Sequence, residues 1–513
     1  MRWQVGSREQ AVADSLSLFN AIEGLRSIPR EEEIRAERFA QWRFAYYRLS
    51  GHLLAGHHAP TGAPSEADTD LAFQTTERMR ARTLIDRFDV AGASSDTTAA
   101  TSLELPTIGT IRSALREDEA LIAYQLANLT REGAQFGSWV WVVTSASATA
   151  VPVPPPDQLS ASVDVYLGLV QRRDGSDGPA SARLYADYLA PALRSLPPVV
   201  NKLLIVPDDA LHRVPFGALR ETADGTLAGT RFEMSILPSA SMWLRWRSTS
   251  AALNNAPALV LADPTLPDTT PGAPSERSAE ALAPLPEART EAAAVARAIG
   301  RGSVVLRGDD ATERRVKQAD LRDFRVLHFA AHALIDDARP DRTAVLLAKA
   351  GSDDGRLQIS EIVNLPLSGQ VVLLSACRSA SGTLVPGEGA LGLAHAFFRA
   401  GARAVVATLW TVRDRDAGEA FSLVAEGLGR GETVASAVAS ARRTLAGRGE
   451  PAAAWAGLVV MGDGNLVPFP GGRTTGPAWW HVVFTLLLMT TATGWIVARR
   501  QRLGRQKASP QVT

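Results

Sequence analysis

The chain contains a single cysteine, Cys377, among its 513 residues. One thiol excludes an intrachain disulfide framework and a zinc site built from several thiolates. The sequence also lacks a phosphate loop of the Gly-x4-Gly-Lys-Ser/Thr type, a Cys-x-x-Cys pair and a His-Glu-x-x-His motif, so we expect no cofactor and no metal. Neither charge is in excess, because 54 Lys+Arg balance 54 Asp+Glu, which argues against nucleic acid as a partner.

An export signal is missing too, since the N-terminus holds no apolar run of roughly 7 to 15 residues. Residues 478–498 form a long run without Asp, Glu, Lys or Arg, followed by a basic tail at 499–513. As a helix this run would span about 31 Å, which matches a hydrocarbon core of about 30 Å. We therefore expect a C-terminal transmembrane helix and a single-pass membrane protein.

The orientation in the membrane stays open at this point. The positive-inside bias places the short basic tail in the cytoplasm and the bulk of the chain outside, yet no signal that would export that bulk is visible. The favoured interpretation is a tail-anchored protein whose globular part is cytoplasmic. An upstream export signal absent from this sequence and a cleavable C-terminal sorting tag are the alternatives.

The remainder of the chain divides by composition and periodicity. Residues 1–90 carry helical spacing and predict an α-helical leader, and the small, polar stretch 91–103 is a linker. Beyond it, short apolar runs alternate with helical stretches, which predicts an α/β domain with a mostly parallel sheet flanked by helices. The runs lie at 120–126, 139–144, 203–206, 258–261, 304–306, 326–330, 371–374 and 404–409. A loop at 263–284 divides the domain into halves at 104–289 and 290–466, and 467–477 is a second linker.

Two of these predicted strands run into residues that carry chemistry: 326–330 leads to His332, and 371–374 leads to Cys377. The carboxyl ends of neighbouring parallel strands meet at one edge of a sheet, so we expect the two side chains to converge. A free thiol, with a pKa of about 8.5, is only slightly ionised at neutral pH and needs an adjacent base. His332 is therefore expected as general base and Cys377 as nucleophile, with an oxyanion hole from the backbone N–H groups of Cys377 and Ala333.

Four segments in this region, in this order, resemble the CHAT domain, a caspase- and separase-like class of cysteine peptidases usually found with tetratricopeptide repeats. They are RVLHFAAHALID, VVLLSACRSASG, PGEGALGLAHAFFRAGARAVVATLWTVRD and PAAAWAGLVVMGDG, and the likeness extends over about 104–465. The resemblance implies a caspase-like sheet in two halves, a non-catalytic first and a catalytic second, with His332 and Cys377 in the dyad positions. It also implies that the leader is a shortened repeat region, although no clean repeat period is visible in it.

The chain departs from the family pattern at two positions. Ala333 stands where related peptidases commonly have glycine, and Arg378 stands where many CHAT sequences have glutamate. Arg378, Glu388, Trp410 and Asp414 are nonetheless expected at the substrate cleft. Glu388 fits equally well as a carboxylate at a helix start, and Asp414 either meets a basic side chain of the substrate or is a solvated loop acid.

Other histidines are weaker candidates. His328 lies within a predicted strand and is expected in the core, and a zinc site of His328, His332 and Cys377 would lack a fourth ligand. His212 is the rival base, in the other half of the domain. The sequence thus predicts a membrane-anchored cysteine endopeptidase with a protein substrate and an activating protein partner. A weakly active or inactive scaffold that docks partners through its leader, and an acyltransferase or esterase using the same dyad, remain alternatives.

Overall fold

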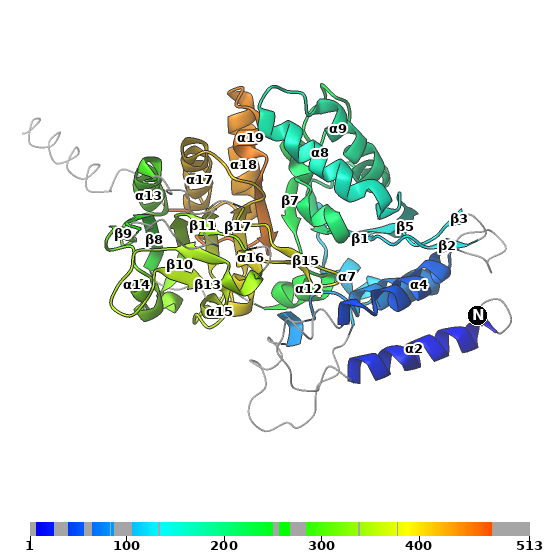
Figure 1. Cartoon of the computed structure of the whole chain (residues 1–513). Coiled ribbons are helices and arrows are strands. Elements are labelled where there is room, and N and C mark those ends of the chain that lie inside the picture. The colour runs from blue at the N-terminus through cyan, green and yellow to red at the C-terminus, as the bar shows by residue number, and fades with distance from the viewer. Residues whose placement is uncertain are drawn as a thin grey trace, which may run out of the picture.

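The computed structural model describes residues 7–24, 39–55, 64–82, 84–86, 105–131, 134–249, 256–266, 284–336, 339–376 and 378–473. One 11-stranded sheet crosses the described domain in the order β5-β4-β1-β6-β7-β18-β17-β14-β10-β8-β9 (Figure 1). All neighbours pair in parallel except β5–β4, β4–β1 and β17–β18, which are antiparallel. The two halves therefore share a single sheet.

The strands of this sheet are short and mostly apolar. They are β1 (Glu119–Gln125), β4 (Trp139–Thr144), β5 (Ala148–Pro152), β6 (Lys202–Val206), β7 (Glu233–Ile236), β8 (Ala256–Pro264), β9 (Val304–Gly308), β10 (Phe324–Ala330), β14 (Val371–Ser375), β17 (Ala404–Thr408) and β18 (Leu458–Gly462). Smaller sheets pair β2 (Thr130–Arg131) with β3 (Ala134–Gln135), β11 (Ala333–Leu334) with β12 (Ala344–Leu346) and β13 (Arg356–Gln358), and β15 (Thr383–Val385) with β16 (Gly389–Leu391).

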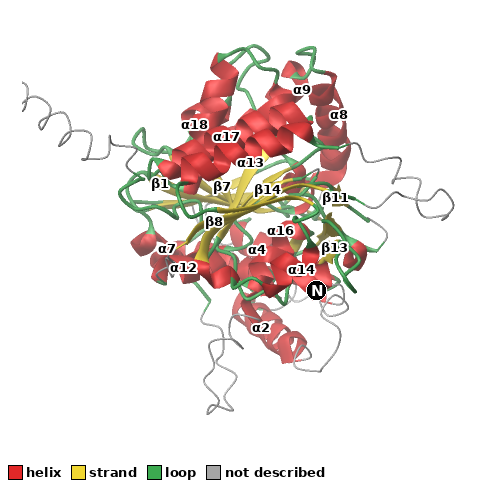
Figure 2. Ribbon diagram, turned by 90° about the vertical axis from the view of Figure 1, so that its left-hand side faces the viewer, coloured by secondary structure: helices red, strands yellow, loops and turns green. Residues whose placement is uncertain are grey.

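Helices cover both faces of the sheet (Figure 2). The first face carries α8 (Leu159–Arg172), α9 (Gly178–Leu184), α13 (Pro286–Ile299), α17 (Asp414–Gly429) and α18 (Val434–Gly447). The second face carries α4 (Arg43–Leu54), α7 (Ile108–Ala114), α12 (Ala240–Ser248), α14 (Glu313–Gln318) and α16 (Leu393–Ala400). The remaining α-helices are α2 (Arg8–Gly24), α5 (Glu66–Glu77), α10 (Ala190–Leu193), α11 (Ala228–Arg231), α15 (Ile359–Ile362) and α19 (Ala452–Trp455).

Strand β14 shows why these segments form buried strands. All five of its residues are buried, because helices lie on both sides. Val371 and Leu373 belong to the core on the first face, whereas Val372 and Leu374 belong to the core on the second. Successive side chains of a strand point to opposite faces, so a continuous apolar run fits a strand covered on both sides. Each fully buried leucine or valine contributes about 1.5–3 kcal/mol.

The N-terminal helices pack against the second face of the sheet (Figure 1). At the end of α5, the wholly buried Glu77 accepts hydrogen bonds from the backbone N–H of Ser241 (3.0 Å) and from its hydroxyl (2.9 Å). Arg80 forms an ion pair with the same carboxylate at 3.1 Å. A buried carboxylate needs such partners to be stable, and they fix the leader to the domain.

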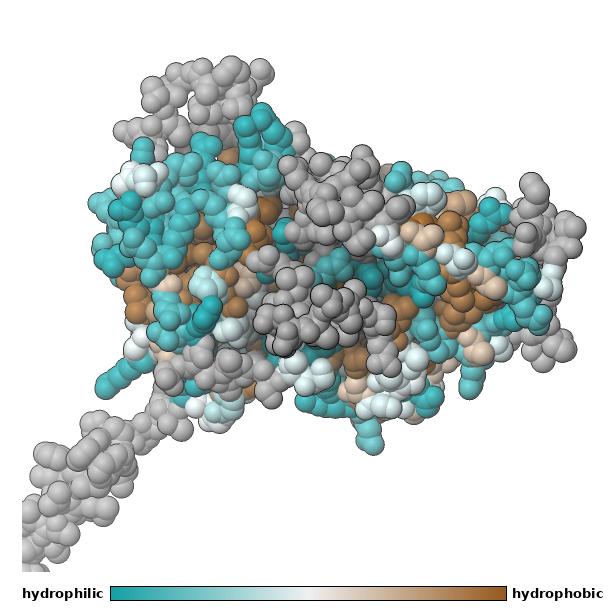
Figure 3. All heavy atoms as spheres, turned by 90° about the horizontal axis from the view of Figure 1, so that it is seen from below, coloured by the Kyte–Doolittle hydropathy of each residue, from teal (hydrophilic) through white to brown (hydrophobic). Residues whose placement is uncertain are grey.

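The surface seen from below carries separate hydrophobic patches among hydrophilic residues (Figure 3). Leu18, Trp42 and Phe44 of the N-terminal region are large apolar side chains that remain exposed, Phe44 by 55%. A single exposed apolar side chain is common on protein surfaces and needs no explanation. Three of them in the N-terminal region are a feature typical of surfaces that contact other proteins.

The single-pass membrane architecture expected from the sequence is contradicted. Within the ranges that the structure describes, no helix combines the length and the apolar character needed to cross a bilayer. The expected helix at 478–498 and its basic tail lie outside those ranges. The prediction rested on the length of an apolar run without charged residues. Length and composition alone do not determine that such a run forms a membrane-spanning helix. The predictions of a membrane helix and of a membrane localisation are therefore wrong.

Candidate active site

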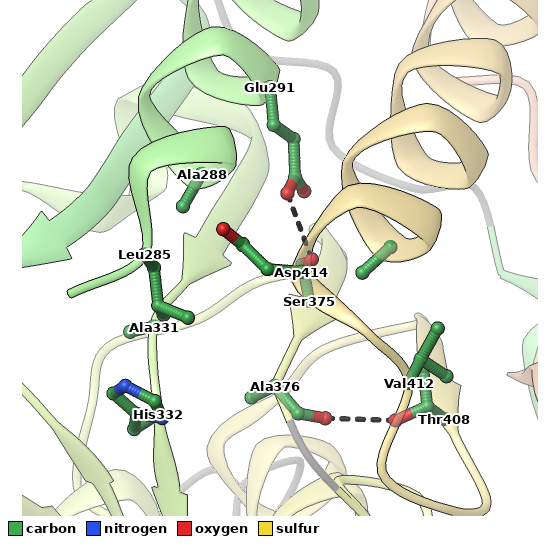
Figure 4. A pocket seen from close by; sticks show the side chains of 11 residues that line it. Leu285, Ala288, Glu291, Ala331, His332, Ser375, Ala376, Thr408, Val412 and Asp414 are labelled. Atoms are coloured by element: carbon green, nitrogen blue, oxygen red, sulfur yellow. Dashed lines mark hydrogen bonds between the residues drawn. The ribbon is translucent and has the colours of Figure 1, made fainter. Parts of the chain in front are cut away.

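Strands β10 and β14 bring the two expected dyad positions to one edge of the sheet. The strands are parallel neighbours, and Ala330 lies opposite Ser375. His332 follows Ala330 by two positions, and Cys377 follows Ser375 by the same two. Cys377 lies outside the described residues, but Ala376 before it lines one pocket together with His332 (Figure 4).

The chain leaves the main sheet after Ala330, the last residue of β10, and His332 lies just before the small strand β11. The His332 carbonyl accepts a hydrogen bond from the N–H of Leu346 at 2.9 Å, and Ala333 pairs with Val345 in the antiparallel β11–β12 ladder. With this bond pattern the Ala333–Val345 pair is of the non-hydrogen-bonded type, so the N–H of Ala333 points away from β12. Ala333 is not among the residues with positive φ, and alanine is therefore compatible with the backbone where relatives have glycine.

Four hydrogen bonds hold the described residues on either side of Cys377, which lie between β14 and the turn at 378–380 and within that turn. The hydroxyl of Thr408, the last residue of β17, donates to the carbonyl of Ala376 at 2.9 Å. The buried hydroxyl of Ser379 donates to the carbonyl of Leu374 (3.0 Å) and accepts the N–H of Thr408 (3.1 Å). The N–H of Ala380 donates to the carbonyl of Thr408 at 2.9 Å. The residues on either side of the cysteine are thus tied to both β14 and β17.

Arg378, directly after Cys377, adopts a left-handed backbone conformation with φ of 53°. This conformation costs a non-glycine residue about 1–2 kcal/mol, and such backbone strain is concentrated at functional sites. Its carbonyl accepts hydrogen bonds from the N–H (2.9 Å) and the hydroxyl (2.6 Å) of Ser381. The side chain of Arg378 is exposed and does not line the pocket with His332.

A buried acid lies behind the end of β14. Glu291 of α13 is 2% exposed, and its Oε2 accepts a hydrogen bond from the hydroxyl of Ser375 at 3.1 Å. Nε2 of His328 lies 2.9 Å from Oε1, but the atoms are not aligned for a hydrogen bond, and neither has such a partner in the described part of the chain. The two groups are therefore close together without a hydrogen bond between them. His328 is fully buried and lies against Phe421, so it is a core residue.

Asp414 is the first residue of α17 and lines the same pocket. Its Oδ2 accepts the N–H of Glu287 at 3.0 Å. Burial raises the pKa of Asp414, and the negative charges of Glu291, Glu287 and Asp263 raise it further, although the backbone hydrogen bond opposes them. Asp414 is thus a half-buried pocket residue rather than a solvated loop acid.

The other two expected cleft residues lie elsewhere. Trp410 is 4% exposed, and its indole N–H donates to the carbonyl of Ala453 at 3.1 Å, which makes it part of the packing around α19. Glu388 is buried and lines a second pocket together with His212 and His395. The rival base His212 is therefore grouped with Glu388 and not with the residues around Ala376.

Sequence reasoning missed four residues that shape this site. Ser375 and Ser379 flank Cys377 in the chain, and that proximity was a usable signal. Thr408 lies one residue before the end of the predicted run at 404–409 and is the last residue of β17. Glu291 gave no local signal, because it lies on an ordinary amphipathic helix and reaches Ser375 only through the fold. Among the described residues, no three His, Cys, Asp or Glu side chains are grouped in a way that would hold a metal ion.

The CHAT domain family model matches residues 178–463, which is more than half of the chain, and the chain belongs to this family. Tetratricopeptide repeat protein 28 of Mus musculus is 25% identical over 300 residues, a match that covers 50% of this chain and 12% of that protein. The Homo sapiens protein of the same name is 24% identical over the same shares. The chain therefore corresponds to a small part of these curated relatives.

Solved structures show a weak likeness. The Saccharomyces cerevisiae separase–securin complex gives a TM-score of 0.46 at 10% identity, covering 88% of this chain and 37% of that chain. The complex of Porphyromonas gingivalis RgpB pro- and mature domains gives 0.36 at 12% identity, covering 56% and 69%. Scores at this level support no conclusion about the site.

Proposed function

We propose that this CHAT protein is a cysteine endopeptidase in which His332 activates Cys377. The observation that carries the proposal is the register of β10 and β14, in which Ala330 pairs with Ser375. His332 and Cys377 each follow their paired strand residue by two positions in the chain. Parallel neighbours end at the same edge, where ligands and catalytic groups of α/β sheets collect. The strained backbone at Arg378 and the hydrogen bonds around the turn support the same assignment.

In the proposed reaction the imidazole of His332 takes the thiol proton of Cys377. The thiolate attacks the carbonyl carbon of a peptide bond, and the backbone N–H groups of Cys377 and Ala333 bind the oxyanion that forms. The imidazolium then protonates the departing amine, leaving an acyl-enzyme. A water molecule, deprotonated by the same imidazole, hydrolyses this thioester and restores the thiol.

An activating protein partner is part of the proposal. The N-terminal region exposes Phe44 and other large apolar side chains, and its end contacts the hairpin that follows the nucleophile. There the N–H of Ala81 donates to the carbonyl of Gly387 at 2.8 Å. A Cβ at Gly387 would collide with the carbonyl oxygen of Met79, so the contact is tight. A partner bound to the leader would act on the hairpin through this contact.

Because the chain has one cysteine, any thiol labelling reports on Cys377 alone. The test is the rate of alkylation by iodoacetamide between pH 5 and pH 9, for the full chain and its His332→Ala and His212→Ala variants. We expect the wild type to react faster than a free thiol near pH 6.5, His332→Ala to react no faster than a free thiol, and His212→Ala to match the wild type.

Covalent labelling by a substrate-like probe supplies the second readout. A peptide acyloxymethyl ketone mixture should label the wild type and fail to label Cys377→Ala or His332→Ala. Unchanged reactivity in His332→Ala, or its loss in His212→Ala, would reject the assignment of the base. A wild-type thiol that reacts like free cysteine and is not labelled would favour the scaffold alternative.

A further inference from the structure

The pocket between α13 and α17 carries two carboxylates at the end of the sheet where the dyad is proposed. Glu291 comes from α13 and Asp414 from α17, and both line the pocket with His332 and Ala376. Figure 4 shows the carboxylates on one side of the pocket, with His332 and Ala376 on the other. The free space is small, about 40 Å³, which suits one side chain rather than a larger ligand.

The charges of these carboxylates are not balanced by a cation in the pocket. Glu291 is 2% exposed, and its Oε1 lies 2.9 Å from Nε2 of the core residue His328 without accepting a hydrogen bond from it or from any other residue that the structure describes. Arg289, on the same helix, is already paired with Asp263 at 2.5 Å. Among the described residues, no Lys or Arg side chain lines the pocket. A buried carboxylate oxygen without a donor is costly, and a bound cation would supply the missing partner.

The walls of the pocket are aliphatic between its two polar ends. Leu285, Ala288, Val412 and Ala417 line it together with the acids. Small apolar walls ending in carboxylates suit a side chain with a methylene stem and a charged head, because the stem packs and the head is paired. Lysine and arginine are the residues of that description.

We propose that this pocket binds the basic side chain of the substrate residue whose carbonyl the thiolate attacks, with Asp414 and Glu291 as the specificity-determining residues. The side chain enters past His332 and Ala376, lies along the aliphatic walls and places its cation between the two carboxylates. The inference rests on the proposed peptidase function for its role in cleavage. Binding of the side chain alone does not require turnover.

The first experiment therefore measures binding without catalysis. Titrations of the full chain with n-butylguanidine and with n-pentylamine, followed by ligand-observed NMR, distinguish an arginine-like from a lysine-like preference. We expect saturable binding of at least one of them, weakened on the order of 10- to 100-fold by Asp414→Asn, since a hydrogen bond to a charged group is lost. Asn keeps the size of Asp414 and an oxygen that can accept the N–H of Glu287.

Asp416→Asn is the matched control. Asp416 lies on the same first turn of α17 but pairs with Arg173 at 2.7 Å and does not line the pocket. The control should bind both cations as the wild type does. Should Asp414→Asn fail to fold, Glu291→Gln provides the same comparison from α13. Absence of saturable binding, or binding unchanged by the folded pocket variant, would overturn the inference.

A second experiment links the pocket to cleavage. Fluorogenic peptides that vary only at the residue before the dye should be cleaved best with Arg or Lys there, and Asp414→Asn should reduce that preference on the order of 10- to 100-fold. Cleavage with a preference for acidic or apolar residues would reject the inference and leave the peptidase function standing. If the chain binds the cations but its thiol is unreactive, the pocket inference stands and the peptidase function is rejected.

Discussion

Ser379→Ala tests whether the turn around the proposed nucleophile is held by its buried hydroxyl. The Ser379 side chain is fully buried, and its Oγ both donates to the carbonyl of Leu374 and accepts the N–H of Thr408. Alanine removes both bonds and offers no replacement. We expect the variant to be less stable and its thiol to be less reactive, because the turn loses two of the four hydrogen bonds that connect it to β14 and β17.

The magnitude follows from the two groups that lose their partner. Leaving a buried polar group unsatisfied costs about 1–3 kcal/mol, so the free energy of unfolding should fall by about 2–4 kcal/mol. The range stops below twice the upper bound because the Leu374 carbonyl has a second lone pair, so losing one donor does not remove its whole capacity to accept hydrogen bonds. Against a typical stability of about 5–15 kcal/mol, a loss of this size is readily measured.

Urea denaturation gives the free energy of unfolding, and the iodoacetamide rate gives the reactivity of Cys377. Ser381→Ala is the control, since the Ser381 hydroxyl makes one bond, to the carbonyl of Arg378, at an exposed position of the same turn. We expect it to cost less than about 1 kcal/mol. If Ser379→Ala is as stable and as reactive as Ser381→Ala, the hydroxyl does not hold the turn.

Two further predictions concern other parts of the molecule. Burial, and then the charge of Arg399, lowers the pKa of His395 to about 3, below its value of about 6.5 in the unfolded chain. Between these two pH values the unfolded chain binds more protons than the folded chain, so the free energy of unfolding should fall as the pH falls. His395→Gln should make the free energy of unfolding, measured by urea titrations between pH 4 and pH 8, depend less on pH. An unchanged pH dependence would contradict the effect. Glu77→Ala removes one partner of the buried pair with Arg80, 3.1 Å apart, and should cost about 3–5 kcal/mol by urea denaturation and speed the proteolysis of the leader. A stability loss no larger than that of the exposed Glu66→Ala would show that the pair does not anchor the leader.

The strands around the site were predictable because their composition matches their environment. The run at 371–374 became β14 (Val371–Ser375), and the run at 326–330 became most of β10 (Phe324–Ala330). Both strands are buried on two faces, so their apolar character is continuous and their ends are marked by polar residues. The convergence of the strand ends followed from the parallel pairing alone.

The parts that escaped prediction depend on contacts that are distant in the chain. Strand β18 (Leu458–Gly462) was not among the predicted runs, although it lies between β7 and β17. Glu291 and Asp414 meet at the pocket because α13 and α17 pack together, and neither helix carries a local mark of this pairing. Trp410 was expected at the substrate cleft, but its side chain packs against α19. There its ring is buried and its indole N–H donates to a backbone carbonyl.

The place of β18 also bears on how the protein is made. This strand is the last one in the part of the chain that the structure describes, yet its neighbours are β7 and β17, from earlier segments. Until the chain has been synthesised as far as residue 462, β7 and β17 each have an unpaired edge. The sheet then consists of two pieces, one ending at β7 and the other at β17. A nascent chain that stops short of this strand therefore keeps the two pieces of the sheet apart, with β10 and β14 already neighbours in one of them, and the domain reaches its joined form only when its synthesis is complete.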